Sequence, residues 1–313
     1  MVIDGHAHAC GEYLTPESIL DNLDRAGASM VTLSPQILGD NGYPLMDVGK
    51  VFQLRDAMRP INLFLKALPA EALTPISLDA ANQRVYELHC QLPAQVLQFY
   101  WVDPTQTGFL RKTQEKFEEY DFIGIKVHQC VHDFDVDGGQ VELLARFAGE
   151  KRIPFFLHLF NMEQTEKLVK LAQRYPDTIF IVAHLICIEA FIEKELRLKN
   201  VFFDISPVPV VGEGRVLLAV KCFGADHILL GSDTPFGRHD LEANVRRIDE
   251  MKWLTAQEKR LILGENMMGI LRWKQGGMKK HEPSPLPEKT LSEQLGQEWQ
   301  HSPKNRETGP YNL

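Results

Sequence analysis

The sequence has few cysteines, and they are not arranged as a redox or zinc motif. Five occur among 313 residues, namely Cys10, Cys90, Cys130, Cys187 and Cys222, and no two are separated by only two residues. An odd and scattered set of this kind is typical of reduced thiols and excludes a disulfide framework. We therefore expect a cytoplasmic protein.

The chain also lacks a long hydrophobic run and an excess of basic residues. No stretch approaches the length of a transmembrane helix, and the apolar start runs directly into Asp4 and His6, which leaves no room for an export signal. The net charge of −8 argues against a nucleic-acid-binding surface, which is usually basic. We expect a small-molecule partner, with neither nucleic acid nor a membrane bound.

Short apolar segments recur along the chain, and helical patterns separate them. Most are rich in Val, Ile and Phe and carry few charges, which is typical of strands buried on both faces. Neither a G-x-G-x-x-G motif nor a Walker loop supports the alternative, a doubly wound open sheet. Eight strand–helix units over residues 1–275 therefore predict a (β/α)8 TIM barrel. The expected strands are 1–9, 29–35, 94–104, 122–128, 153–159, 178–185, 201–207 and 227–237.

Capping residues and apolar periodicity locate several helices. Thr15 is a suitable N-cap for a helix that begins at Pro16 and ends near Gly27. Helical periodicity continues over 163–176, and Thr255 is a suitable cap for a last helix over 255–273.

The segment between the second and third expected strands, 35–93, is too long for a simple loop and helix. Its patterns predict further helices over 48–59 and 77–92. A helical insertion after the second strand of a barrel lies on the active-site side, where it can form a lid. The alternative is that these helices pack on the flank of the barrel, and the sequence leaves both open.

After residue 275 the sequence becomes polar and rich in Pro, Gly, Lys and Glu. We interpret 276–313 as a C-terminal extension of the barrel domain. A segment of this composition wraps the barrel, contacts a neighbouring subunit, or is disordered. The second of these alternatives predicts a homo-oligomer, most simply a dimer.

The first expected strand carries His6 and His8 on either side of an alanine. Side chains alternate along a strand, so the two imidazoles point to the same face, which Asp4 shares. Two imidazoles on one face can chelate one metal ion. Alone, this H-x-H pattern is weak evidence, because ordinary histidines also occur at strand ends.

Three further polar residues strengthen the case for a metal site. His158, His184 and Asp233 fall near the ends of the fifth, sixth and eighth expected strands, where a buried strand should be apolar. The active sites of TIM barrels lie at the carboxyl ends of their strands. We therefore expect these three side chains to join the two histidines of the first strand in one site.

This combination resembles the amidohydrolase superfamily, and within it the amidohydrolase-related (amidohydrolase 2) branch, which includes decarboxylases and lactonases. The resemblance covers roughly residues 1–275. It is carried by D-G-H-A-H in the first strand, one histidine each in the fifth and sixth, G-S-D-T-P-F-G in the eighth, and G-E-N-M-M-G-I-L in the last helix.

The resemblance implies a mononuclear metal centre and assigns its residues. His6, His8, His158 and Asp233 are the implied ligands of one divalent metal. This donor set suits Zn²⁺, with Mn²⁺ or Fe²⁺ as alternatives. Asp233 is the implied catalytic base. His184 is implied to polarise a carbonyl, to act as an acid–base group, or to bind a second metal.

Five other residues are candidates for the pocket. In binuclear members of the superfamily a strand-four lysine is carboxylated and bridges two metals, but the branch resembled here is usually mononuclear. We therefore expect Lys126 to bind a substrate carboxylate. We expect His128 to line the substrate pocket, with a core or capping role as the alternative. Glu12 and Tyr13 are weaker candidates, and Asp204 orients a ligand, lines the pocket or makes a structural hydrogen bond.

The expected activity is hydrolysis of a C–N or C–O bond in a small amide, lactone or related molecule. Nonoxidative decarboxylation of a small aromatic or unsaturated carboxylic acid would use the same ligands, so the ligands do not separate the two reactions. A catalytically silent barrel is the third alternative. Loss of a metal ligand would indicate it, and none of the implied ligands is missing.

Overall fold

The computed structural model describes residues 1–36, 56–67, 77–236 and 239–274. The chain divides into two units, Met1–His281 and Glu282–Leu313, and all described residues belong to the first. The expected extension from residue 276 therefore lies outside the described residues, as does most of the helix expected over 48–59.

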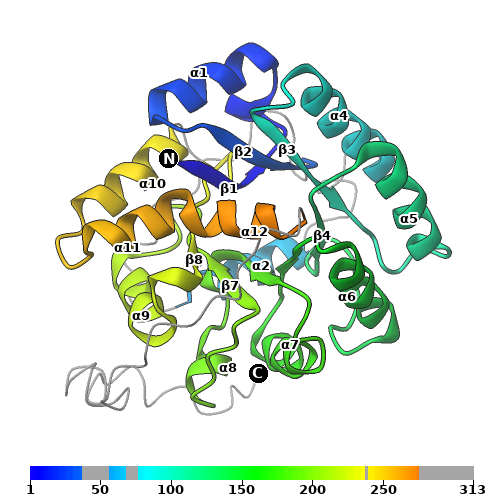
Figure 1. The fold of residues 1–313 in the computed structure, drawn as a ribbon. Coiled ribbons are helices and arrows are strands. Elements are labelled where there is room, and N and C mark those ends of the chain that lie inside the picture. The colour runs from blue at the N-terminus through cyan, green and yellow to red at the C-terminus, as the bar shows by residue number, and fades with distance from the viewer. Residues whose placement is uncertain (37–55, 68–76, 237–238, 275–313) are drawn as a thin grey trace. The chain divides into compact units, whose positions relative to one another are not determined.

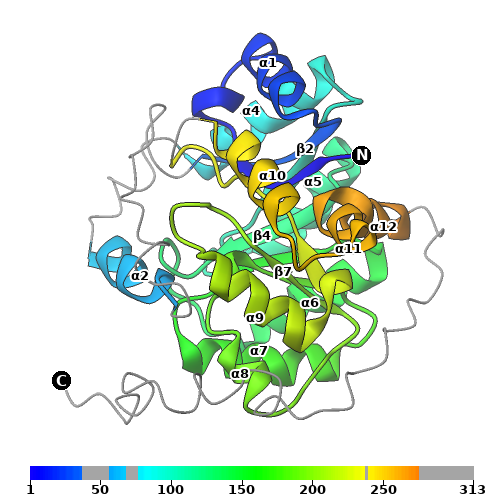
Figure 2. The ribbon, with the colours of Figure 1, turned by 90° about the vertical axis from the view of Figure 1, so that its left-hand side faces the viewer.

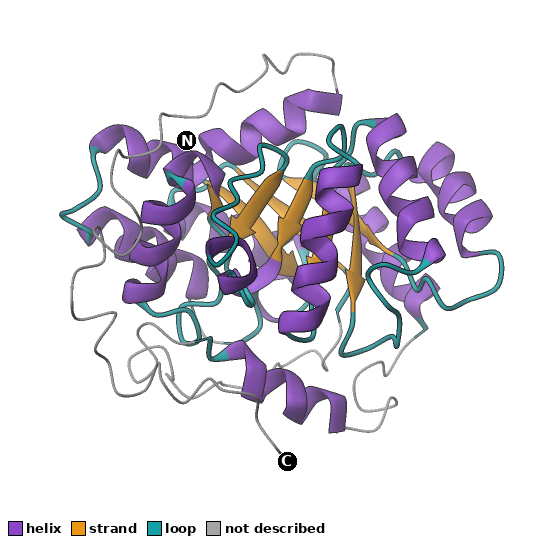
Figure 3. Ribbon diagram, turned by 90° about the horizontal axis from the view of Figure 1, so that it is seen from below, coloured by secondary structure: helices purple, strands orange, loops and turns teal. Residues whose placement is uncertain are grey.

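Eight parallel strands form a barrel with helices around it, as the sequence predicts (Figure 1). Each strand pairs with the next one in the chain. Figure 3 shows the strands in the centre, with helices on both sides of them. The strands are β1 (Ile3–His8), β2 (Met30–Ser34), β3 (Val96–Trp101), β4 (Gly124–His128), β5 (Phe155–His158), β6 (Phe180–Val182), β7 (Val201–Asp204) and β8 (Ile228–Leu229).

Backbone hydrogen bonds join the first strand to the segment of the last. Gly5 N donates to Leu230 O at 2.9 Å, and Ser232 N donates to His6 O at 3.0 Å. Glycine permits this approach, because a Cβ on Gly5 would meet Leu230 O at 2.7 Å. The two walls of the barrel that are farthest apart in sequence are therefore in direct contact.

Helices cover the outside of the barrel, and none that the structure describes is long and apolar enough to cross a membrane. The first one confirms its predicted cap, because the side chains and backbones of Thr15 and Ser18 form a reciprocal capping box. The helices of the barrel wall are α1 (Pro16–Ala26), α5 (Phe109–Tyr120), α6 (Gly139–Lys151), α7 (Met162–Arg174), α8 (Glu189–Ile192), α9 (Glu213–Phe223) and α10 (Asp240–Glu250).

The helix expected over 255–273 and its Thr255 cap are confirmed, but the helix is kinked. α11 (Ala256–Arg260) begins after the Thr255 cap, but a π turn interrupts it before α12 (Asn266–Lys274) begins. Gly264 lies at the break, and a Cβ there would meet Met1 O at 2.8 Å. The helix is interrupted where it passes close to the start of the chain.

Two described helices lie between β2 and β3, and they occupy different places. α4 (Leu78–Gln91) lies beside β3 on the flank, while α2 (Met58–Ala67) and α12 lie on opposite sides of the barrel (Figure 2). Asn62 of α2 donates to the carbonyls of Leu159 and Phe160, directly after β5. The insertion therefore contributes both to the flank and to the carboxyl end of the barrel.

Aromatic rings fill the barrel interior beneath the site. Phe99 of β3 lies over Gly124 of β4, where a Cβ would be only 2.2 Å from the ring. Phe99 meets Phe156 of β5 edge-on, with 5.9 Å between the ring centres. The Phe156 ring in turn lies 4.5 Å from the ring of His6, and so supports the first histidine of the H-x-H pattern.

Candidate metal centre

The two histidines of β1 converge with Asp233 in a buried cluster. His6 Nε2 lies 3.3 Å from Asp233 Oδ1, and His8 Nε2 lies 3.5 Å from the same oxygen. All three side chains are buried, and each offers a ligand atom within 4.8 Å of the others. Two imidazole nitrogens and one carboxylate oxygen are donors that suit a divalent metal such as Zn²⁺.

Hydrogen bonds determine which ring nitrogen faces this cluster. His6 Nδ1 lies 3.0 Å from Asp204 Oδ2, and His8 Nδ1 lies 2.5 Å from Pro35 O. A carboxylate and a carbonyl only accept, so both Nδ1 atoms carry the hydrogen and both Nε2 atoms keep the lone pair that a metal needs. Asp204 therefore makes a structural hydrogen bond that orients the His6 ring, while the ligand role of that ring stays a prediction.

Burial keeps these imidazoles neutral, which is the form that binds metals. It lowers the pKa of His6 and His8 well below the usual value, and the charge of Lys126 lowers it further. Burial also raises the pKa of Asp233 to about 7, against the opposing effect of the nearby His184 and Lys126. The carboxylate is therefore a stronger base than an exposed aspartate.

Lys126 of β4 reaches the middle of the same cluster. Its Nζ lies 2.8 Å from His6 Nε2 and 3.0 Å from His8 Nε2. Burial lowers the pKa of this lysine to about 8, although the charges of Asp233 and Asp204 oppose the shift. The structure thus places Lys126 in the site, while contact with a substrate carboxylate stays a prediction.

His184 and Asp233 lie beyond the strands, and the strand ends predicted there are wrong. β6 ends at Val182, so His184 belongs to the 3-10 turn Ala183–Leu185, and β8 ends at Leu229. Both residues have left-handed backbones, with φ of 56° and 52° respectively. Such conformations cost about 1–3 kcal/mol each in non-glycine residues and cluster at functional sites.

His184 lies beside His6, with 5.1 Å between the ring centres, and approaches the other carboxylate oxygen of Asp233. Its Nε2 lies 3.7 Å from Asp233 Oδ2, and its Nδ1 lies 2.6 Å from Ser206 O. Because Ser206 O accepts the Nδ1 hydrogen, the lone pair of a neutral His184 is on Nε2 and faces the carboxylate. The two oxygens of Asp233 thus face different histidines, and the acid–base role of His184 stays a prediction.

His158 lies beside the cluster rather than within it. Its ring stacks on His128 with 3.7 Å between centres and 11° between planes, and these two form a second buried group with Cys130. Parallel rings direct their lone pairs side by side instead of toward one point, and His128 Nδ1 already accepts from Cys130 N. The second group is therefore poorly arranged for a metal. His158 as the fourth ligand of the first cluster stays a prediction.

A family model described as amidohydrolase matches residues 3–272 of the chain. The chain belongs to the amidohydrolase family. No curated protein is significantly similar to it in sequence. The resemblance seen in the sequence is therefore confirmed by the family match.

Several solved structures share the fold of this family member. A putative amidohydrolase from Staphylococcus aureus is 15% identical, with a TM-score of 0.61, over 86% of this chain and 99% of that one. 4-Oxalomesaconate hydratase from Rhodopseudomonas palustris is 15% identical, with a TM-score of 0.60, over 88% and 97%. A dihydroxybenzoic acid decarboxylase from Polaromonas sp. JS666, with bound manganese and an inhibitor, is 15% identical, with a TM-score of 0.59, over 87% and 96%. At these identities the likeness shows the fold alone.

Two of the predicted pocket residues in this amidohydrolase-family chain have structural partners. Tyr13 Oη donates to Asp4 Oδ2 at 2.7 Å, in a fully buried position. Glu12 forms ion pairs with Arg25 and His239, both at 3.1 Å. Their contact with a substrate stays a prediction.

Four residues at the site were not predicted from the sequence. The carbonyl of Pro35 and the amide of Asn62 lie in or beside the insertion and carry no local signal. Ser206 follows β7, and its hydroxyl oxygen lies 3.1 Å from His6 Nδ1. Trp101 is the last residue of β3 and stacks on His128 with 8° between planes, so its position at a strand end was the available signal.

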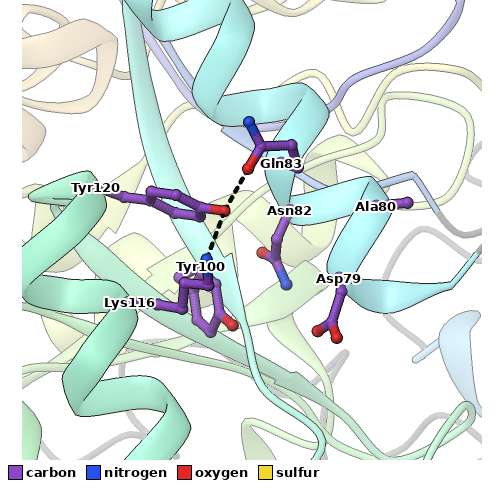
Figure 4. Close-up of a pocket in the computed structure, with 7 residues that line it drawn as sticks. All are labelled: Asp79, Ala80, Asn82, Gln83, Tyr100, Lys116 and Tyr120. Atoms are coloured by element: carbon purple, nitrogen blue, oxygen red, sulfur yellow. Dashed lines mark hydrogen bonds between the residues drawn. The ribbon is translucent and has the colours of Figure 1, made fainter.

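A separate cavity of about 300 Å³ lies on the flank of the barrel between α4 and α5 (Figure 4). Lys116 Nζ donates to the hydroxyl of Tyr120, which in turn hydrogen-bonds Gln83. The cavity is linked to the metal centre only indirectly, because its Asn82 also holds the backbone of Trp101. It is lined by Asp79, Ala80, Asn82, Gln83, Tyr100, Lys116 and Tyr120.

Proposed function

We propose that this protein is a metal-dependent hydrolase that cleaves a C–N or C–O bond in a small molecule, such as an amide or a lactone. The observation that carries the proposal is the convergence of His6, His8 and Asp233, with His184 near the second oxygen of the same carboxylate. Family membership supports a reaction of this kind.

In this proposal His6, His8, Asp233 and His158 hold one divalent metal. Zn²⁺ fits the donors, and Mn²⁺ or Fe²⁺ are alternatives. When bound, the metal polarises the substrate and lowers the pKa of a water molecule toward neutrality. The manganese in the Polaromonas enzyme supports a divalent metal in this fold.

Asp233 and His184 move the proton. Asp233 takes it from the attacking water, and its Oδ2 lies 3.7 Å from His184 Nε2. Because His184 Nδ1 donates to Ser206 O, Nε2 is the atom that receives the proton and delivers it to the leaving nitrogen or oxygen. Asp233 thus acts as the base and His184 as the acid.

The substrate in this proposal carries a carboxylate that binds Lys126. The ammonium group is buried 5.4 Å from the centre of the Trp101 ring and hydrogen-bonds His6 Nε2 and His8 Nε2, the two atoms assigned to the metal. In this proposal it gives up these two bonds when the metal binds and pairs with the substrate carboxylate, with little competition from water. His128, which stacks on Trp101, lines the same part of the proposed pocket. If Lys126 were carboxylated instead, it would bridge two metals, and we expect only one metal per chain.

Nonoxidative decarboxylation is the second candidate function. It is favoured by the same buried cation, which suits an aromatic or unsaturated carboxylic acid, and by the dihydroxybenzoic acid decarboxylase among the solved structures of this fold. Assays of lactones, amides and aromatic carboxylates, with carbon dioxide release recorded in parallel, separate the two reactions. Release of carbon dioxide without hydrolysis would replace the first candidate by the second.

The test of the site is the Asp233→Asn variant. We expect turnover to fall by about a thousandfold or more, because the variant lacks the base that the proton transfer requires. The matched control is Asp21→Asn, which changes an exposed carboxylate on α1 and should retain full activity.

Full activity in Asp233→Asn would contradict the site assignment. A metal measurement tests the hydrolase and decarboxylase proposals together. Protein purified without chelator should contain about one equivalent of metal per chain. Less than about a tenth of an equivalent would favour a catalytically silent barrel.

A further inference from the structure

Asn62, in the described part of the insertion, contacts the segment that carries His158. It lies on α2 and is fully buried. Its Nδ2 donates to Leu159 O and to Phe160 O, both at 2.9 Å, and its Oδ1 lies 2.8 Å from His158 Nε2. Both amide hydrogens and the amide oxygen of this side chain therefore have partners.

These contacts determine the orientation of the Asn62 amide. A half-turn of the amide would place Oδ1 against two carbonyl oxygens, neither of which can donate a hydrogen. Oδ1 must therefore face His158, and because Oδ1 only accepts, the hydrogen of this bond belongs to His158 Nε2. In a neutral imidazole the other ring nitrogen then keeps the lone pair.

We propose that Asn62 is a positioning residue for the metal centre: it keeps the hydrogen of His158 on Nε2 and so reserves Nδ1 for the metal. The proposal rests on the proposed function, in which His158 completes the ligand set. Histidine ligands commonly donate their second ring hydrogen to an outer partner, and loss of that partner weakens metal binding.

The role is the counterpart of the one that Asp204 and Pro35 have for the β1 histidines. Those acceptors hold Nδ1–H and leave Nε2 as the ligand atom of His6 and His8. Asn62 holds Nε2–H and leaves the opposite nitrogen of His158. The centre therefore needs both tautomers of histidine, and the insertion supplies the partner that selects the second one.

The tautomer of His158 can be measured directly. In protein labelled with ¹⁵N-histidine, two-bond ¹H–¹⁵N spectra distinguish a ring protonated at Nε2 from one protonated at Nδ1. The signal of His158 is identified by its absence from the His158→Gln variant. We expect Nε2–H in the unaltered chain and loss of this preference in Asn62→Leu, which has the same number of side-chain heavy atoms but no acceptor. Nδ1–H in the unaltered chain would overturn the proposal, whether or not the variant folds.

Metal affinity provides the second measurement. Competition between the protein and a chelator for Zn²⁺ should show an affinity about 10–100-fold weaker in Asn62→Leu. The control is Lys66→Met, because Lys66 also anchors α2, through Gln129 O and Asp133, but does not contact His158. Equal weakening in both variants would mean that Asn62 only anchors the helix, and would overturn the proposal.

The two measurements also separate this proposal from the proposed function. If the unaltered protein bound no Zn²⁺, Mn²⁺ or Fe²⁺, the proposed function and the metal-directed role of Asn62 would both be wrong. If it bound metal with an unchanged affinity in Asn62→Leu, only the role of Asn62 would be wrong.

Discussion

Single atoms of a few side chains decide what the metal centre can bind. Asp204 is the clearest case, because four donors surround its carboxylate: His6 Nδ1, the backbone and hydroxyl of Ser206, and the backbone of His184. A group that only accepts is required at this position. The charge of Asp204 is therefore used for orientation, while Asp233 is the proposed base.

Asp204→Asn should disturb this arrangement although the two side chains have nearly the same shape. The amide would direct its own hydrogens at one or more of the four donors, which costs about 1–3 kcal/mol of stability for each unpaired group. We also expect Zn²⁺ affinity to fall about 10–100-fold, because His6 loses its fixed tautomer. Urea unfolding and chelator competition measure the two effects. Unchanged values for both would show that Asp204 does not orient His6.

Side chains of neighbouring strands pack against one another inside the barrel. Gly124 of β4 faces the ring of Phe99, and Phe99 faces Phe156 beneath His6. The Phe99 ring has space only because residue 124 has no side chain. Phe99 in turn packs against Phe156, which contacts the ring of His6.

Gly124→Ala should therefore destabilise the barrel by about 1–3 kcal/mol, because the new Cβ overlaps a buried ring that has little room to move. The control is Gly139→Ala at the start of α6, where a Cβ would meet nothing within 4 Å. Calorimetry of both variants measures the difference. If the two variants melted together, the contact between Gly124 and Phe99 would not constrain the fold.

Local patterns were sufficient for the barrel but not for every element boundary. Most strands are recognisable because each is apolar over its own length, and the H-x-H pattern of His6 and His8 needs only the alternation of a strand. The ends after β6 and β8 were misjudged because left-handed backbone at His184 and Asp233 depends on distant contacts, such as Asp233 N donating to His6 O. The break at Gly264 likewise lies against the backbone of Met1, which is distant in the sequence.

The contacts of the insertion could be predicted from local sequence patterns even less than the strand ends. Asn62 bonds to Leu159 and Phe160, which are 97 and 98 positions away, and nothing in the sequence around it distinguishes it from a surface residue. The family resemblance predicts the metal ligands, but it does not predict the residues that hydrogen-bond them. Those residues are identified only from the folded structure.

At the scale of the whole molecule, the barrel with its candidate site is contained in the unit Met1–His281. A chain that ends after residue 281 should therefore unfold in one transition, within about 3 °C of the full-length protein. It should also bind the same amount of Zn²⁺. Calorimetry and metal analysis test this, and loss of the transition would show that residues 282–313 are required for the fold.

The same truncated chain tests the proposed homodimer. Sedimentation of both proteins gives their masses in solution. If the extension contacts a neighbouring subunit, the full-length chain should sediment as a dimer and the shortened one as a monomer. A monomer in both cases would contradict the contact between subunits.

The bond between the two ends of the barrel also determines when the site can exist during synthesis. The backbone N of Ser232 donates to Asp4 Oδ1 at 2.9 Å, and these two residues are 228 positions apart in the sequence. At about 5–20 residues per second, a ribosome completes the stretch between them in roughly tens of seconds. Throughout that time the growing chain carries both histidines but lacks Asp233, so the candidate metal centre is incomplete. Its three converging side chains can meet only after translation has passed the last strand.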